Sequence, residues 1–234
     1  MVDITRDADR LATLGSYDLM DTPPEPPFDI IVAQSAELAN APISLISLLD
    51  DRREWFKAKR GTDLDGLPLD QSICIDVLRS GATYVVPDAA AHEVYRNFPL
   101  VRDGLIRFYA GVPLTLKSGV SLGSLCVIDV APRAALDVDE RRALEALARR
   151  TVAAFELRRE IRAQAAAEAR LKGAGSTEHR VWLDRASDLL AQASAALDQI
   201  GAASAAAHLE HVIAMVDELR DAPAPEQPES TRPL

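Results

Sequence analysis

The alternation of apolar and polar residues is clearest between residues 106 and 129, where it predicts two antiparallel strands. One face of the first strand would carry Ile106, Phe108, Ala110, Val112 and Leu114. A Lys-Ser-Gly turn follows, and the second strand, at residues 122–129, is apolar on both faces. Alternation with a period of two around such a turn predicts a β-hairpin. A strand that is apolar on both faces is typical of the centre of a sheet covered by helices.

Three further strands precede this hairpin. The almost continuous apolar run at residues 43–49 predicts a buried strand. After an Asp-Asp-Arg turn, residues 53–60 alternate as its partner, with Trp55 and Phe56 on opposite faces. β-Branched and aromatic residues predict a short strand at 83–86.

Helices are predicted on either side of these strands. Apolar residues at helical spacing predict helices at residues 6–15 and 28–40, separated by a Pro-rich extended connector. A short helix that ends at about residue 79 is expected, because Asp70 or Ser72 can cap its start and a Ser-Gly pair ends it.

The C-terminal third is predicted to be helical. Asp137 and Glu140 form a capping box for a long helix that reaches about residue 169 and projects out of the domain. Two amphipathic helices follow, with apolar residues spaced by fours and threes. In the first these are Trp182, Ala186, Leu189, Ala193, Ala196 and Ile200, and in the second Ala202, Ala205, Leu209, Val212, Val216 and Leu219. Heptad spacing interrupted by a short break predicts an antiparallel hairpin.

This pattern predicts four parts. They are a domain at residues 1–160, a helical extension and linker at 161–176, the hairpin at 177–220 and a disordered Pro- and Glu-rich tail at 221–234. Because two helices bury only part of their apolar stripes against each other, we expect a homodimer whose hairpins form a four-helix coiled-coil bundle.

The composition limits the partners that this chain can have. A net charge of −10 and a pI near 4.9 argue against binding to nucleic acid or to an anionic membrane. No run approaches the ~18 apolar residues of a membrane span, and the N-terminus lacks the apolar core of a signal peptide. Two cysteines do not make a disulfide framework, so we expect a reduced, cytoplasmic protein.

Five motifs follow one another along the chain: LMDTPPEPPFD, ISLISLLDDRREWFKAKRG, YVVPDA, FYAGVPL and LGSLCVID. The last two resemble the last two core strands of a GAF domain, the small-molecule sensor module of many bacterial signalling proteins, and the other three precede them in the order of that family. The resemblance covers roughly residues 10–159. It implies an α+β fold, in which a central antiparallel sheet is flanked by helices and the two-helix hairpin follows.

The resemblance also implies a ligand cavity on one face of the sheet, roofed by residues 61–79 and 88–107. The residues expected to line it are Trp55, Ser72, Cys74, Asp76, Asp88, Arg107, Tyr109 and Ser124. A polar Arg107 and Tyr109 would suit an anionic or hydrogen-bonding ligand. The alternative is that side chains fill the cavity and Arg107 pairs with Asp88 or Asp129.

Cys74 is the residue of this set with the most reactive chemistry. A position near a helix start would lower its pKa and make it reactive, whereas a small apolar core residue is the alternative. Chromophore-bearing members of the family usually have His after this Cys, and here Ile75 follows, so no bilin is expected. Cys126 is expected in the core, and a Cys74–Cys126 redox switch is the other possibility. No haem, metal or cyclic-nucleotide signature is present, and we do not expect an enzyme.

His179 is the one candidate for chemistry outside the sensor domain. The Glu-His-Arg-Val sequence around it resembles part of the phosphoacceptor box of one class of sensor histidine kinases. Trp182-Leu183 departs from that box, and the sequence contains no ATP-binding domain, so we expect no autophosphorylation. The options left open are phosphotransfer with a separate two-component signalling partner, and a remnant used only for dimerisation.

The sequence therefore predicts a signal-transduction sensor. A small molecule, which the sequence does not identify, would bind the GAF domain, and a dimeric helical bundle would relay its occupancy. The alternatives are a histidine-kinase-like phosphotransfer protein acting through His179, and a dimerisation scaffold that binds no ligand.

Overall fold

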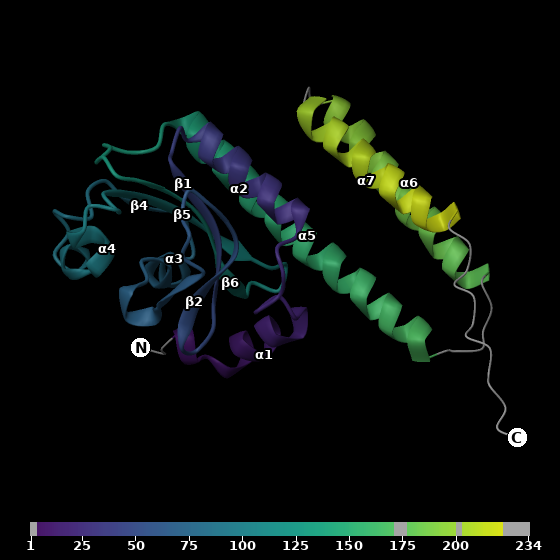
Figure 1. Ribbon diagram of the computed structural model, residues 1–234, viewed down its shortest axis with the longest axis horizontal. Coiled ribbons are helices and arrows are strands. Elements are labelled where there is room, and N and C mark those ends of the chain that lie inside the picture. Colours follow the sequence, from purple (N-terminus) through teal and green to yellow (C-terminus); the bar gives the residue numbers. More distant parts are fainter. Residues whose placement is uncertain (1–3, 171–176, 200–202, 222–234) are drawn as a thin grey trace, which may run out of the picture. The chain divides into compact units, whose positions relative to one another are not determined.

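The structure is a computed structural model that describes residues 4–170, 177–199 and 203–221 (Figure 1). The chain forms two compact units, Met1–Arg162 and Ala163–Leu234. Residues 171–176 of the predicted extension and linker, and nearly all of the predicted disordered tail, lie outside the described residues. None of the helices in the described ranges is long and apolar enough to cross a membrane.

The first unit is built on a six-stranded sheet in which all neighbouring strands are antiparallel. Its strands are β1 (Ile43–Leu49), β2 (Arg53–Arg60), β3 (Gly66–Pro68), β4 (Tyr84–Val86), β5 (Phe108–Thr115) and β6 (Ser121–Asp129). Their order across the sheet is β3-β2-β1-β6-β5-β4. The predicted fold class, a central antiparallel sheet flanked by helices, is confirmed. β3 is an additional strand that the sequence did not predict.

Three helices cover one face of the sheet: α1 (Ala8–Tyr17), α2 (Pro26–Leu38) and the N-terminal part of α5 (Val138–Arg170). Phe28 of α2 and Phe155 of α5 meet in the core, with ring centroids 5.3 Å apart. The predicted capping box is confirmed, because the Glu140 N–H donates to Asp137 Oδ1 at 2.7 Å and the Asp137 N–H donates to Glu140 Oε2 at 2.8 Å. This capping fixes where α5 begins beside the sheet.

We call the opposite face of the sheet the α3 face. It is covered by α3 (Cys74–Ser80), α4 (Pro99–Arg102) and the short 3-10 turns η1 (Ile4–Arg6), η2 (Leu69–Gln71) and η3 (Tyr95–Asn97). Figure 1 shows α3 and α4 on the other side of the sheet from α2 and α5. Buried side chains under this cover include Leu45, Phe56, Val77, Tyr95, Tyr109 and Cys126.

Close contact between the two central strands depends on one glycine. A Cβ atom at Gly123 of β6 would overlap the backbone carbonyl oxygen of Ser47 in β1. Only glycine permits this approach, so the glycine before Ser124 is required by the sheet itself.

The second unit contains α6 (Thr177–Gln199) and α7 (Ala203–Asp221), which pack against each other. Ser187 Oγ donates to Asp217 Oδ1 at 3.1 Å, a pairing that an antiparallel hairpin produces. Leu189, one of the residues at heptad spacing in α6, is 60% exposed in the single hairpin. Leu183 is buried instead. Apolar residues occur in adjacent pairs along α6, such as Trp182 and Leu183. Heptad spacing alone therefore does not identify which residue of a pair contacts α7.

Candidate functional site

Alternation along the strands directs several polar side chains to the α3 face. We call them the buried polar cluster: Ser47, Glu54, Ser72, Cys74, Tyr109, Ser124 and Cys126. Ser47 and Ser124 are directly opposite each other on β1 and β6. Because side chains of one strand alternate between the two faces, Ser124 and Cys126 of β6 share the α3 face. Each member of the cluster is at most 4% exposed.

Cys74 lies at the centre of this cluster. Its thiol donates to Glu54 Oε1 at 3.0 Å, and its Sγ lies 3.1 Å from Tyr109 Oη. Tyr109 reaches this position because Gly111 has no side chain; a Cβ there would lie 2.5 Å from Tyr109 Oη. The cluster therefore joins residues of β2, α3 and β5.

Burial determines the protonation of this centre. It raises the pKa of the Cys74 thiol well above its usual value, and neighbouring Cys126 and Glu54 raise it further. The pKa of Tyr109 is raised by burial and by Cys74. Of the two alternatives for Cys74, the buried core residue agrees with the structure and the thiol with a lowered pKa does not, because loss of solvent outweighs the influence of the seven-residue α3. The structure makes Cys74 a buried, protonated thiol.

Three hydroxyl groups of the cluster have no hydrogen-bond partner within the described part of the chain. They are the Oγ atoms of Ser47, Ser72 and Ser124. A buried polar atom without a partner costs about 1–3 kcal/mol, so three in one region are unusual. Each of these buried hydroxyls therefore has unused hydrogen-bonding capacity.

Asp76 belongs to a separate network of buried hydroxyls. The Tyr95 hydroxyl donates to Asp76 Oδ2 at 2.5 Å and lies 3.0 Å from the Tyr84 hydroxyl. Burial and the Asp76 carboxylate raise the pKa of Tyr95. Asp76 also accepts from Arg79 at 2.9 Å, so its carboxylate is already engaged.

Arg107 and Asp88 form a two-bond ion pair. Arg107 donates to the two Asp88 carboxylate oxygens at 2.8 and 2.7 Å. The guanidinium holds the pKa of Asp88 below its usual value. This is the pairing considered as an alternative to anion binding, and it engages two of the five N–H donors of the guanidinium.

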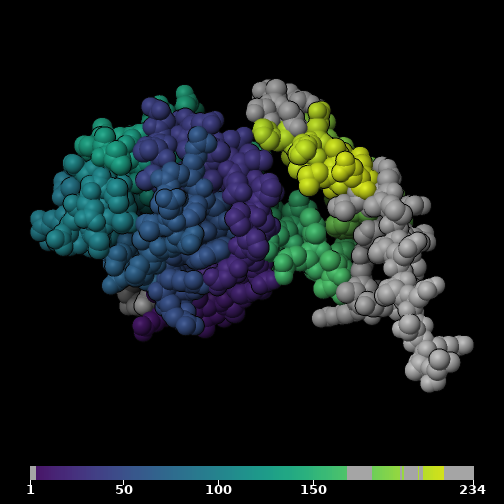
Figure 2. Space-filling view, viewed as in Figure 1, coloured from purple at the N-terminus to yellow at the C-terminus, as the bar shows by residue number. Residues whose placement is uncertain are grey.

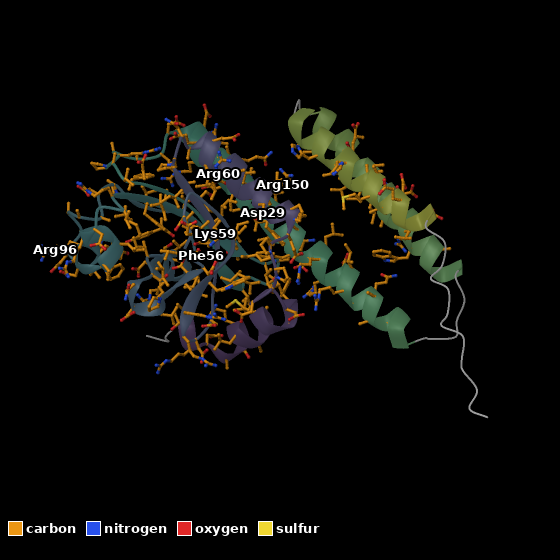
Figure 3. The ribbon with its side chains drawn as sticks, viewed as in Figure 1. Asp29, Phe56, Lys59, Arg60, Arg96 and Arg150 are labelled. Carbon is orange, nitrogen blue, oxygen red and sulfur yellow. The ribbon has the colours of Figure 1, made fainter. Side chains whose placement is uncertain are left out.

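An apolar cavity of about 110 Å³ lies beside the buried polar cluster. Its lining residues are Ile43, Leu45, Phe56, Gly61, Thr62, Leu64, Leu67, Leu100, Leu105, Ile106 and Ile128. Phe56, which Figure 3 labels, is opposite Ser47, and Leu67 is opposite Glu54. The cavity and the cluster are therefore neighbours across the β1–β2–β3 part of the sheet.

The eight residues predicted to line a cavity are distributed over different environments. None of them lines the apolar cavity. Ser72, Cys74, Tyr109 and Ser124 come together in the buried polar cluster, whereas Asp76, Asp88 and Arg107 form the pairs described above. Trp55 packs against the opposite core and borders an open groove near Pro23 and Pro68. The segment of residues 50–70, blue in Figure 2, lies in the middle of the face of the first unit shown there.

The cluster residues Ser47 and Glu54 were missed from the sequence. The signal for Glu54 was present, because a carboxylate two residues before Phe56 lies on the same, apolar face of its strand. Ser47 lies within a run of leucine and isoleucine. Only the pairing of β1 with β6 shows that it faces another serine.

Two other predictions bear on chemistry. His179 lies in the first turn of α6, and its side chain is outside the described residues. Over the described ranges, no three His, Cys, Asp or Glu side chains are grouped so that they could hold a metal ion.

Comparison with known proteins places the first unit among its relatives. Residues 23–155 match the family model of the GAF domain. A cyclic di-GMP phosphodiesterase of Pseudomonas aeruginosa is 38% identical over 125 residues, which are 53% of this chain and 21% of that protein. The chain thus spans about a fifth of the length of this relative.

Solved structures similar to this chain include two bacterial proteins. The GAF domain of an Acinetobacter phosphoenolpyruvate-protein phosphotransferase has a TM-score of 0.49 and 20% identity, over 67% of this chain and 95% of that one. A free methionine-R-sulfoxide reductase from Neisseria meningitidis has a TM-score of 0.48 and 18% identity, over 69% of this chain and 95% of that one.

Proposed function

Since the chain belongs to the GAF domain family, we propose that it is a signalling sensor that binds a small molecule on the α3 face. Occupancy of that face would control a homodimeric helical bundle, and no reaction would be catalysed. The relative from Pseudomonas aeruginosa is named for cyclic di-GMP, a signalling molecule, which supports a signalling role without identifying the ligand.

The observation that carries this proposal is the set of three buried serine hydroxyls without partners. A scaffold that bound nothing would gain stability by replacing them with alanine, because each unmet hydroxyl costs free energy. A ligand that hydrogen-bonds to them gives a reason for their presence. The adjoining cavity supplies space for the rest of a small molecule.

The proposed relay from the sheet to α5 is supported by a chain of ion pairs. The Lys57 ammonium of β2 contacts Glu25 Oε1 at 2.5 Å, and Arg158 Nε of α5 contacts the same carboxylate at 2.8 and 2.9 Å. Arg158 also donates to the carbonyl oxygens of Tyr17 and Asp18 at the end of α1. A ligand that prefers one arrangement of β2 would shift the population of α5 arrangements through these contacts.

The homodimer is proposed because apolar residues of the hairpin are exposed in the single chain. Val181, Leu189 and Met215 are 63, 60 and 53% exposed in the single chain. A second hairpin would cover them, as in a four-helix bundle. Phosphotransfer through His179 has no further observation in its favour.

Native mass spectrometry of freshly purified protein, under gentle and then denaturing conditions, tests the proposal. A dimer carrying a small mass that denaturation releases is the expected result, and S47A/S124A protein should retain less of it. Bare dimers that also fail to gain mass after incubation with a cell-extract metabolite fraction would contradict the sensor role. A bare monomer would contradict both the sensor and the bundle.

A further inference from the structure

Glu54 differs from the other charged residues that the structure buries. Among the described residues these are Arg10, Lys57 and Glu54, each at most 4% exposed. Arg10 donates to three backbone carbonyl oxygens, and Lys57 contacts Glu25. Glu54 accepts only the hydrogen bond from the Cys74 thiol, and no described lysine or arginine lies within ion-pair distance of it. A buried carboxylate is stable only when a cation or strong donors compensate it.

We propose that the ligand of the α3 face is a small organic ammonium ion whose positive group binds Glu54. This inference rests on the proposed sensor function and specifies the chemical class of its ligand. An ammonium group has three N–H donors and no acceptor. It would supply the missing charge to Glu54 and could also donate to a serine hydroxyl oxygen of the cluster.

The positions of the two serines fit this role. Ser47 and Ser124 face each other across β1 and β6, and their Oγ atoms have no partner among the described residues. Glu54 lies two residues before Phe56, which is the β2 partner of Ser47. Because residues two apart on a strand share a face, the carboxylate and the hydroxyls converge on one region of the α3 face.

The apolar cavity would hold the carbon chain of the ligand. Two of its lining residues, Leu67 and Phe56, are the cross-strand partners of Glu54 and Ser47. Cavities of about 150 Å³ lined by apolar residues bind benzene, so about 110 Å³ suits a chain of roughly four carbon atoms. Leu64 and Leu105 belong to the lining and are 42 and 49% exposed, so the cavity has an edge at the surface.

The same region disfavours an anionic ligand. No charged residue lines the cavity, and the guanidinium of Arg107 is engaged by Asp88. A carboxylate placed beside Glu54 would be repelled by it and would lose its water shell without compensation. Of the anionic or hydrogen-bonding ligand expected from the sequence, the anionic option is thus replaced by a cation.

Three probes of similar shape test the sign of the charge: isobutylammonium, isobutanol and isovalerate. Their dissociation constants for the full chain can be measured at pH 7 by calorimetry or by ligand-observed NMR. A hydrogen bond to a charged group contributes enough to expect about 10- to 100-fold tighter binding of isobutylammonium than of isobutanol. Isovalerate should bind weakest.

Variants then assign the preference to one side chain. E54Q should remove the advantage of isobutylammonium over isobutanol, and S124A should reduce it a few-fold. E37Q is the matched control, because Glu37 is an exposed glutamate that contacts only Arg60, at 3.7 Å. This control should bind like the wild type. The comparison of the three probes in wild-type protein needs no variant, so the test remains decisive if E54Q does not fold.

The outcomes separate this inference from the proposed function. Equal or tighter binding of isobutanol or isovalerate to the wild type, or unchanged binding of isobutylammonium to folded E54Q, would overturn the ammonium assignment. The sensor function would survive such a result if a neutral probe bound. No binding of any probe would also overturn the assignment, and the retained-ligand mass measurement would then decide the sensor function independently.

Discussion

Removal of the Glu25 carboxylate should destabilise the first unit, because Lys57 and Arg158 both depend on it. The Lys57 side chain is fully buried, and its ammonium contacts Glu25 Oε1 at 2.5 Å, Thr22 Oγ1 at 2.7 Å and the Pro23 carbonyl oxygen at 2.9 Å. In E25Q the two cations would face each other across a neutral amide. Lys57 would keep two neutral acceptors but lose its counter-ion.

The expected magnitude follows from this geometry. Breaking a fully buried ion pair costs about 3–5 kcal/mol. Glu25 is itself 31% exposed, and Lys57 keeps two acceptors, so we expect a smaller loss of ~2–3 kcal/mol. For a chain of this size, ~2–4 °C of melting temperature per kcal/mol gives a decrease of roughly 5–10 °C.

Urea unfolding followed by tryptophan fluorescence measures this loss. The chain has one tryptophan in each unit, Trp55 and Trp182, so a W182F background reports on the first unit alone. E37Q is the control, because its exposed ion pair should contribute no more than ~0.5 kcal/mol. A double-mutant cycle with K57M isolates the Lys57–Glu25 coupling.

The dependence of the loss on pH provides a second check. Burial lowers the pKa of Lys57 and the contact with Glu25 opposes that effect, so E25Q should lower this pKa further. Above the lowered folded-state pKa, the buried amine is neutral and no longer needs a counter-ion. The difference between E25Q and wild type should therefore shrink as pH rises from 7 toward 10. A coupling energy below ~0.5 kcal/mol, within the range of an exposed pair, or a difference independent of pH, would refute the reasoning.

Three further perturbations test the sheet, the thiols and the surface pair. G123A should destabilise the unit by about 3 kcal/mol in urea unfolding, because its Cβ would overlap the backbone of β1; a neutral result would contradict the close strand approach. Cys74 and Cys126 are buried, so both should react with Ellman's reagent only in denaturant. Because the pKa of Cys74 is raised in the folded protein, the thiol stabilises the fold at pH values below its usual pKa of 9.0, and this contribution is lost as the pH rises above that value. C74A should therefore reduce the loss of stability at alkaline pH. Because the pKa of Asp88 is lowered in the folded protein, its carboxylate stabilises the fold at pH values above its usual pKa of 3.8, and this contribution is lost as the pH falls below that value. D88N should therefore make the loss of stability in acid less steep. R107M removes the partner of the carboxylate and should have the same effect. An unchanged acid profile in both variants would contradict the pair.

The sheet could be predicted from sequence because its strands carry strong local signals. Alternation along β5 and the double-sided apolar pattern of β6 identified the central hairpin, and an apolar run identified β1. The capping box fixed the start of α5, since its two residues interact within a single turn. β3 was missed because three residues show no periodicity, and only pairing with β2 makes them a strand.

The chemistry of the site was harder to predict. Cys74 was expected to have a lowered pKa if it was reactive, a judgement based on its place near a helix start. Its true neighbours, Glu54 and Tyr109, are 20 and 35 positions away. The hairpin shows the same limit, because Leu183 is buried although it lies outside the heptad series, whereas Leu189 within the series is exposed in the single chain.

The sequence by itself determined which elements form and which face of each strand is apolar, because these properties depend on residues a few positions apart. The GAF family could also be identified at this level, from motifs within single strands and turns. Tertiary structure decided which polar side chains share a buried environment, which of them find partners and where space remains. Those properties depend on strand register and on the loss of water between distant segments, and no local pattern encodes them. Glu54, Ser47 and Ser124 became a candidate site only when the pairing of β2, β1 and β6 placed them under α3.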